Sequence, residues 1–199
     1  MLKKIGLISL ATASAFAMHT FEININDKDL GISAKFDVGQ FGNVEPGTTF
    51  IGAKVLNGSD SHSDIKNKIT SFYEINFLKT KKMSNTPLYL GLGLKANYNK
   101  NDDKKFVSIP LGFEGIYKVP STRYVPITLN ASIYYAPEVL SLEDANEFIE
   151  FGVNARFEVI ENGLIVLGYR NIHTNYEIND HKKDIKYNSS AYIGFKFAF

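Results

Sequence analysis

Apolar and polar residues alternate along most of this chain, most clearly at residues 87–99. Leucine occupies every second position from 88 to 94, and the positions between hold Tyr89, Gly91 and Gly93. Because successive side chains of a strand point to opposite faces, this pattern predicts a strand with one apolar face. Nine further segments repeat it. The ten predicted strands cover residues 20–26, 30–38, 48–56, 68–79, 87–99, 106–117, 125–135, 148–160, 164–176 and 187–199.

Charged residues fall almost entirely on one of the two faces. A soluble sandwich or a lipocalin-like barrel would show the reverse arrangement, with charges outside and apolar residues inside. We therefore interpret the apolar face as lipid-facing and the charged face as the wall of a lumen. The predicted lumen charges are Glu22, Lys35, Asp37, Lys54, Glu74, Lys95, Glu114, Glu150, Arg156, Glu158, Arg170 and Lys196.

These lumen charges are balanced, with six acids and six bases. An unpaired buried charge costs several kcal/mol, so charges in a narrow lumen must be paired or hydrated. The balance therefore predicts a cross-linked interior rather than a wide pore. We expect a small outer-membrane β-barrel of structural or narrow-channel type, without catalytic chemistry.

The predicted fold class is all-β: an antiparallel up-and-down transmembrane β-barrel of about ten strands. Most segments reach the ~9–11 residues that a membrane strand needs. The first two are short, so eight spanning strands with an N-terminal hairpin outside the membrane is the alternative. With the C-terminus in the periplasm, the predicted outer loops are residues 26–29, 57–66, 100–104, 137–146 and 177–186. The predicted inner turns are residues 39–47, 80–86, 118–123 and 161–163.

The last nine residues form a strand with an aromatic lipid-facing side. Ile193, Phe195, Phe197 and Phe199 share one face, and Lys196 lies on the other. Terminal aromatic residues of this kind resemble the C-terminal signal that the outer-membrane assembly machinery recognises. We therefore expect two partners, the assembly machinery through this strand and outer-membrane lipid. The oligomeric state is left open.

The N-terminus has the features of a secretory signal. Lys3 and Lys4 precede an apolar run at residues 5–16, and the sequence Ala-Phe-Ala at 15–17 matches a signal-peptidase site. The run is shorter than the ~20 residues of a spanning helix. We expect a cleaved signal peptide at residues 1–17 and a mature barrel at 18–199, exported to the outer membrane of a bacterial cell.

The composition excludes several classes of partner and of binding site. The 199-residue chain has a formal net charge of +1, which argues against nucleic acid as a partner. It has no cysteine, so disulfides and thiolate metal sites are excluded. No phosphate-binding loop, metal-ligand cluster or paired-carboxylate motif is present, so we expect no cofactor and no metal.

Several motifs point to a known group. The sequence SIYYAPEVL at 132–140, Ala-Asn-Glu at 145–147 and Gly-Tyr-Arg at 168–170 precede the aromatic terminal strand. Together they resemble the YfaZ family of outer-membrane proteins, with the best similarity over residues 88–199. The resemblance implies an outer-membrane β-barrel and no catalytic residues.

Two other functions stay open. A barrel that binds or adheres through its outer loops is one, although these loops are short and poor in apolar residues. A lipid-modifying barrel enzyme is the other, and His173 and His181 near the outer rim would be its only candidate residues.

Overall fold

The computed structural model describes residues 19–41, 45–58, 71–101, 104–120, 125–143, 145–178 and 181–199. The expected signal peptide at residues 1–17 and most of the expected outer loop 57–66 lie outside the described residues. Within the described part of the chain, no helix is long and apolar enough to cross a membrane.

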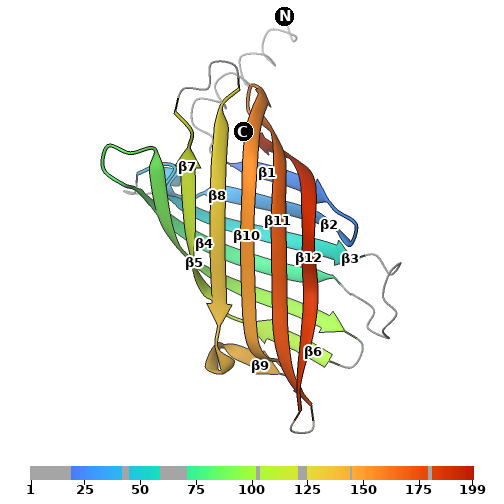
Figure 1. Cartoon of the computed structure of the whole chain (residues 1–199). Helices are drawn as coiled ribbons and strands as arrows, with labels where there is room; N and C mark the ends of the chain where they lie inside the picture. Colours follow the sequence, from blue (N-terminus) through green and yellow to red (C-terminus); the bar gives the residue numbers. More distant parts are fainter. Residues whose placement is uncertain are drawn as a thin grey trace, which may run out of the picture.

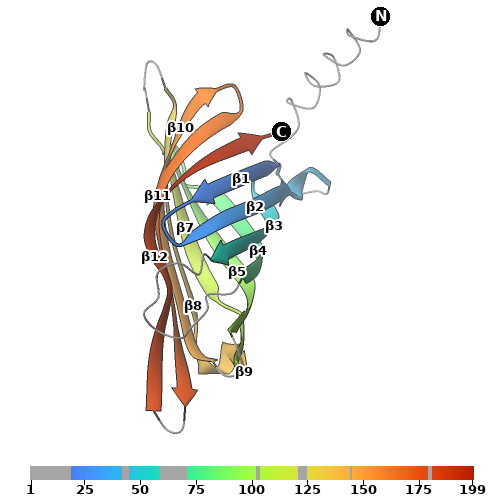
Figure 2. The ribbon, with the colours of Figure 1, turned by 90° about the vertical axis from the view of Figure 1, so that its right-hand side faces the viewer.

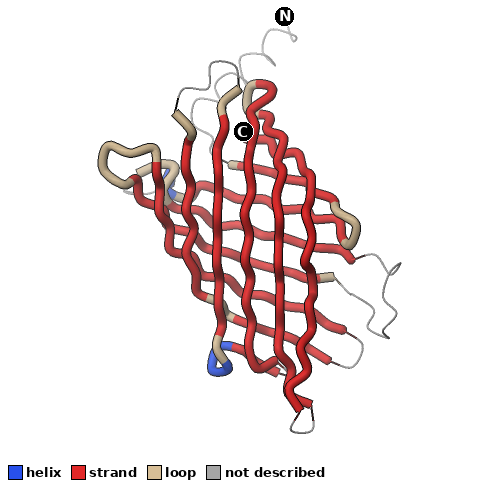
Figure 3. Tube along the Cα trace, viewed as in Figure 1, coloured by secondary structure: helices blue, strands red, loops and turns tan. Residues whose placement is uncertain are grey.

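Strand dominates the described residues, and helix is confined there to two short 3-10 turns, η1 (Gly39–Phe41) and η3 (Glu138–Leu140) (Figure 3). All strand pairs are antiparallel (Figure 1). The strands are β1 (Thr20–Ile25), β2 (Asp29–Asp37), β3 (Thr49–Gly58), β4 (Phe72–Lys82), β5 (Leu88–Asn101), β6 (Lys104–Ser108), β7 (Leu111–Lys118), β8 (Ile127–Ala136), β9 (Ser141–Glu143), β10 (Ala145–Ile160), β11 (Gly163–Ile178) and β12 (His181–Ala198).

The sheet closes into a barrel of ten wall strands. β6 and β7 both pair with β5 and are two parts of one wall strand. The interruption falls at Pro110, which has no backbone N–H to donate to a ladder. Its carbonyl still accepts the N–H of Lys95 at 2.9 Å. β8 and β9 likewise form one wall strand, interrupted by η3, because β8 pairs with β7 and β9 pairs with β6.

Closure involves both ends of the chain. β1 pairs with β2 on one side and with β12 on the other, and β4 pairs with β5. The prediction of a ten-strand antiparallel barrel is confirmed. The alternative of eight strands is wrong, because β1 and β2 lie within the wall between β12 and β3.

The connections alternate between two ends of the barrel. The C-terminus and the β10–β11 turn mark one end, called here the terminal end, and the β11–β12 hairpin marks the other, called the hairpin end (Figure 1). Figure 2 shows this hairpin extending beyond the neighbouring strands. The expected loop at 177–186 is therefore wrong as a loop, since β11 and β12 pair as far as Ile178 and His181.

The expected loop at 137–146 is also wrong in extent. Pro137 leads into η3, after which β9 pairs with β6 and β10 begins at Ala145. The chain therefore continues along the wall as far as Glu143 and returns in β10 from Ala145. Turn-forming residues at 137–138 mimic a loop because the helical turn interrupts the strand without ending its path along the wall.

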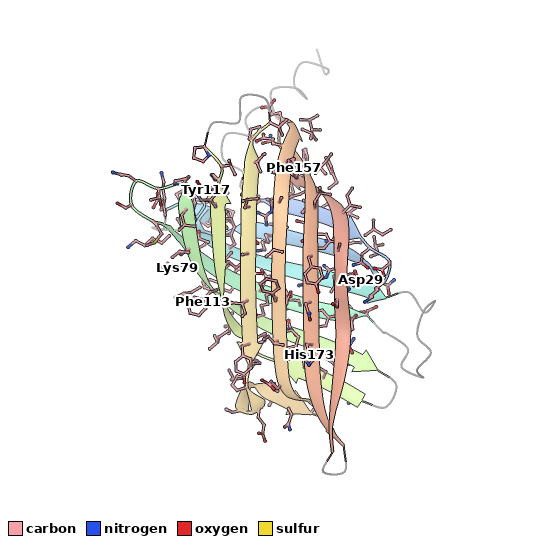
Figure 4. All side chains as sticks on the ribbon, in the orientation of Figure 1. Asp29, Lys79, Phe113, Tyr117, Phe157 and His173 are labelled. Carbon is pink, nitrogen blue, oxygen red and sulfur yellow. The ribbon has the colours of Figure 1, made fainter. Side chains whose placement is uncertain are left out.

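The outer face of the barrel is apolar and the inner face polar. Ile75, Leu92 and Phe113 are 64%, 62% and 65% exposed, and Phe113 is labelled with Tyr117 in Figure 4. Glu74 and Lys95, at positions of opposite parity on β4 and β5, are buried. Such a surface is suited to hydrocarbon, where closed barrels satisfy every backbone group within the wall.

The charged lumen as candidate functional site

Two lysines and two glutamates form a closed ring of ion pairs inside the barrel, called here the ion ring. Lys54 Nζ lies 2.5 Å from Glu74 Oε2 and 2.9 Å from Glu150 Oε1. Lys95 Nζ lies 3.2 Å from Glu74 Oε2 and 2.6 Å from Glu150 Oε2. Each ammonium therefore contacts both carboxylates, and the ring carries no net charge.

The ion ring spans the lumen. Lys54, Glu74 and Lys95 come from the adjacent strands β3, β4 and β5, whereas Glu150 comes from β10, which pairs with β8 and β11. The four side chains are 13% exposed or less. In this low-dielectric setting, pairing offsets part of the desolvation of four buried charges, and each group depends on its partners.

A second charged cluster lies toward the hairpin end. Arg170 Nη2 donates to Asp29 Oδ1 at 2.7 Å, and its guanidinium lies 5.0 Å from the ring centroid of Tyr192. Asn188 donates to the other carboxylate oxygen of Asp29, and Ser190 donates to Asn188 at 2.6 Å. Asp29 was expected in the loop 26–29, but it begins β2 and is 4% exposed. Its pairing with Arg170 was not predicted.

Tyr134 connects the ion ring to a further acid. Its hydroxyl donates to Glu114 Oε1 at 2.7 Å, and Lys95 Nζ lies 3.9 Å from its ring centroid. Glu114 also lies 3.8 Å from Lys35 Nζ. The phenol fits against the inward glycines Gly93 and Gly112, which leave room for it on β5 and β7. These contacts extend the polar network to β2, β7 and β8.

Next to the ion ring, toward the hairpin end, the lumen is filled by apolar side chains. Phe72, Phe148 and Leu56 each lie two residues from a member of the ion ring, on the same inward face. The ring centroids of Phe72 and Phe148 are 6.3 Å apart and stacked, and Phe106 lies 5.5 Å from Phe148. This apolar layer consists of Leu56, Phe72, Phe106, Ala136, Phe148 and Ile172.

The apolar layer was not predicted, although the sequence carries a signal for it. Phe72, Phe148 and Ile172 share the parity of the inward residues Glu74, Glu150 and Arg170. An apolar residue at an inward position next to a strand end therefore indicates a filled lumen, not a lipid contact.

Ten of the twelve predicted lumen charges line one internal cavity of about 120 Å³. The other two lie elsewhere. Asp37 accepts the N–H groups of Gly39 at 3.0 Å and Gly47 at 2.6 Å, so it orders the turn after β2. Glu158 lies in β10 and does not line the cavity. The ten lining residues are Glu22, Lys35, Lys54, Glu74, Lys95, Glu114, Glu150, Arg156, Arg170 and Lys196.

The expected assembly-signal residues lie at the terminal end of β12. Ile193, Phe195, Phe197 and Phe199 are between 42% and 54% exposed and face outward. Their recognition by assembly machinery stays a prediction.

The two histidines considered for catalysis lie in β11 and β12. His173 pairs in register with Ile149 and Lys186, at an outward position beside the buried Ile172. His181 begins β12. Among the described residues, no group of three or more histidine or acidic side chains is placed to hold a metal ion.

The chain was compared with curated proteins, solved structures and family models. None of the curated proteins compared with the chain matches it. One solved structure that matches is the crystal structure of the outer membrane channel DcaP of Acinetobacter baumannii, with 12% identity and a TM-score of 0.41. The match covers 89% of this chain and 54% of that channel, so the chain spans about half of the channel's length. The fold assignment rests on the strand pairing and not on this likeness.

The sequence model of the YfaZ precursor family matches residues 3–199. The resemblance seen in the motifs at 132–140 and 168–170 is thereby confirmed, and the chain belongs to the YfaZ precursor family.

Proposed function

We propose that this protein is a small structural barrel of the bacterial outer membrane whose lumen does not conduct solutes. The observation that carries the proposal is the filling of the lumen by two successive layers. The ion ring joins β3, β4 and β5 to β10, and the apolar layer lies directly beside it. A hydrated solute would have to disrupt both layers in turn.

Each layer opposes passage for a different physical reason. Separating the ion ring leaves buried carboxylates or ammonium groups without partners, which costs several kcal/mol. The apolar layer offers no hydrogen bonds to a solute that has lost its water, so entry of an ion there is still more unfavourable. The cavity of about 120 Å³ borders the ion ring and has room for several water molecules, and the two layers separate it from the hairpin end.

The outer surface and the family support a membrane location. An apolar exterior around a charged interior supports lipid as the surrounding medium, and the family is described as a precursor. We extend this to a cleaved signal at residues 1–17, export to the outer membrane, and contact of the assembly machinery with β12. We also propose that the protein is not an enzyme, since its buried polar groups serve mainly to pair with one another.

Planar-bilayer recordings on the refolded protein test this function. We expect no steady conductance from preparations that show the gel-mobility shift between unheated and heated samples, which reports a folded barrel. A steady conductance in the nanosiemens range would refute the closed barrel and favour a narrow channel.

A further inference from the structure

Three cations face the cavity on the side of the ion ring away from the apolar layer. Lys35, Arg156 and Lys196 come from β2, β10 and β12, and all three line the cavity. Lys196 pairs in register with Glu22, near the terminal end of β12. The charged groups around Lys196 are Arg156, Glu22, Lys35 and Glu114.

Two of these cations lack an ionic partner. The ion ring is neutral, Arg170 is paired with Asp29, and Lys35 lies 3.8 Å from Glu114. Arg156 and Lys196 form no ion pair within the described part of the chain. Arg156 Nε is also buried and donates to no acceptor there. A buried donor without a partner is unfavourable and indicates a place for an acceptor.

The charges around the cavity also leave room for one more negative charge. Six bases line it, against four acids, and Asp29 adds a fifth acid through its pair with Arg170. Glu158 does not line the cavity. A positive excess in a narrow lumen disfavours the folded barrel unless a counter-ion enters.

We propose that the lumen binds one small oxyanion, of phosphate or carboxylate type, between Arg156 and Lys196. An arginine recognises such groups through two parallel N–H bonds, and the unpartnered Nε–H supplies one of them. The ammonium of Lys196 adds a second positive charge from β12. The cavity volume of about 120 Å³ accommodates an anion of this size with a few water molecules. The site binds an anion in a barrel that does not conduct, so it goes beyond the proposed structural function.

Isothermal titration calorimetry of the refolded protein with inorganic phosphate tests the site, with ionic strength held constant by sodium chloride. We expect saturable binding at one site. Arg156→Gln and Lys196→Gln should each weaken it at least tenfold. Lys81→Gln removes an exposed cation that does not line the cavity and should bind as the wild type does. If acetate competes with phosphate, the site accepts oxyanions in general. If acetate does not compete, the site is selective for phosphate. Both results support the proposal.

The gel-mobility shift establishes that each variant is folded before titration. If a variant fails to fold, the wild-type protein alone tests the site. The ³¹P line broadening of phosphate is then measured with and without an excess of sulfate as a competing oxyanion. Broadening that sulfate reverses supports a specific site. Absence of saturable binding by the wild type, or equal binding by the folded variants, would overturn the proposal. Either result leaves the conductance measurement unaffected, so the two proposals fail separately.

Discussion

Lys54 on β3 and Glu150 on β10 meet inside the lumen with 2.9 Å between Nζ and Oε1, although 96 positions separate them in the sequence. The two strands share no hydrogen-bonded edge, so this contact braces the barrel across its interior. Glu150 forms an equivalent contact with Lys95. It is the one ring member that comes from the opposite wall, since the other three lie on β3, β4 and β5.

Replacing Glu150 with leucine should destabilise the barrel by about 3–5 kcal/mol, because two buried ammonium groups then share one carboxylate. Urea unfolding of the refolded protein in detergent, followed by far-UV circular dichroism, measures this change; the chain has no tryptophan to serve as a probe. The double variant Lys54→Met/Glu150→Leu keeps the neutral Lys95–Glu74 pair and should be more stable than Glu150→Leu alone. A double variant at least as unstable as the sum of both single variants would show that the ring is not a coupled unit.

Truncating Phe148 to alanine should cost about 3–5 kcal/mol, since its buried ring contacts both Phe72 and Phe106 and leaves a cavity behind. The same urea titration applies. Phe113→Ala removes a phenylalanine from the lipid face and is the comparison, with a smaller expected loss because detergent fills the space. Equal losses at the two positions would contradict the assignment of Phe148 to a packed interior.

Two glycines three residues apart on β7 should respond differently to alanine. A Cβ at Gly112 would collide with the carbonyl oxygen of Ile133 and with the ring of Tyr134, whereas a Cβ at Gly115 meets only Leu90 Cδ2 at 4.0 Å. We expect Gly112→Ala to destabilise by about 1–3 kcal/mol. Gly115→Ala should change the free energy of unfolding by less than about 0.5 kcal/mol. The reverse order in urea titrations would mean that Tyr134 does not occupy this glycine notch.

Phe199→Ser tests the terminal strand as an assembly signal. The backbone of Phe199 exchanges two hydrogen bonds with His19, and these survive the substitution. We therefore expect near-normal refolding in detergent but a severalfold lower amount of heat-shifting barrel in the outer membrane of expressing cells. Phe113→Ser, a lipid-facing change far from the terminus, should affect refolding and cellular assembly in parallel. Wild-type amounts of Phe199→Ser in the membrane would eliminate the role of this residue in recognition.

The wall of the barrel was predictable because lipid on one side imposes strict alternation on each strand. Leu92 and Lys95 reveal their faces by parity alone, without knowledge of the neighbouring strand. At the hairpin end the sequence does not show this alternation. The paired ends of β11 and β12 extend beyond the neighbouring strands, and the sequence at 177–186 has no continuous apolar face. The start of β2 at Asp29 was also predicted as a turn, because its sequence is polar.

The pairing inside the lumen could not be predicted in the same way. Whether Lys54 contacts Glu150 or Glu114 depends on the register between strands and on their tilt, and neither is encoded in parity. The position of Asp37 shows a further limit. Its parity is inward, yet its carboxylate serves the backbone of the following turn. The filling of the lumen by Phe72 and Phe148 could have been predicted from the sequence, because both occupy inward positions.

The pairing of β1 with β12 has a consequence for biosynthesis. Phe21 lies opposite Phe197, so the first strand finds its second neighbour only when the last one has been translated. Until β1 and β12 pair, the sheet has two open edges, each of which can associate with other chains. Contacts between residues so distant in sequence also form slowly. A chain truncated before β12 would therefore lack the second neighbour of β1 and could not close into a barrel.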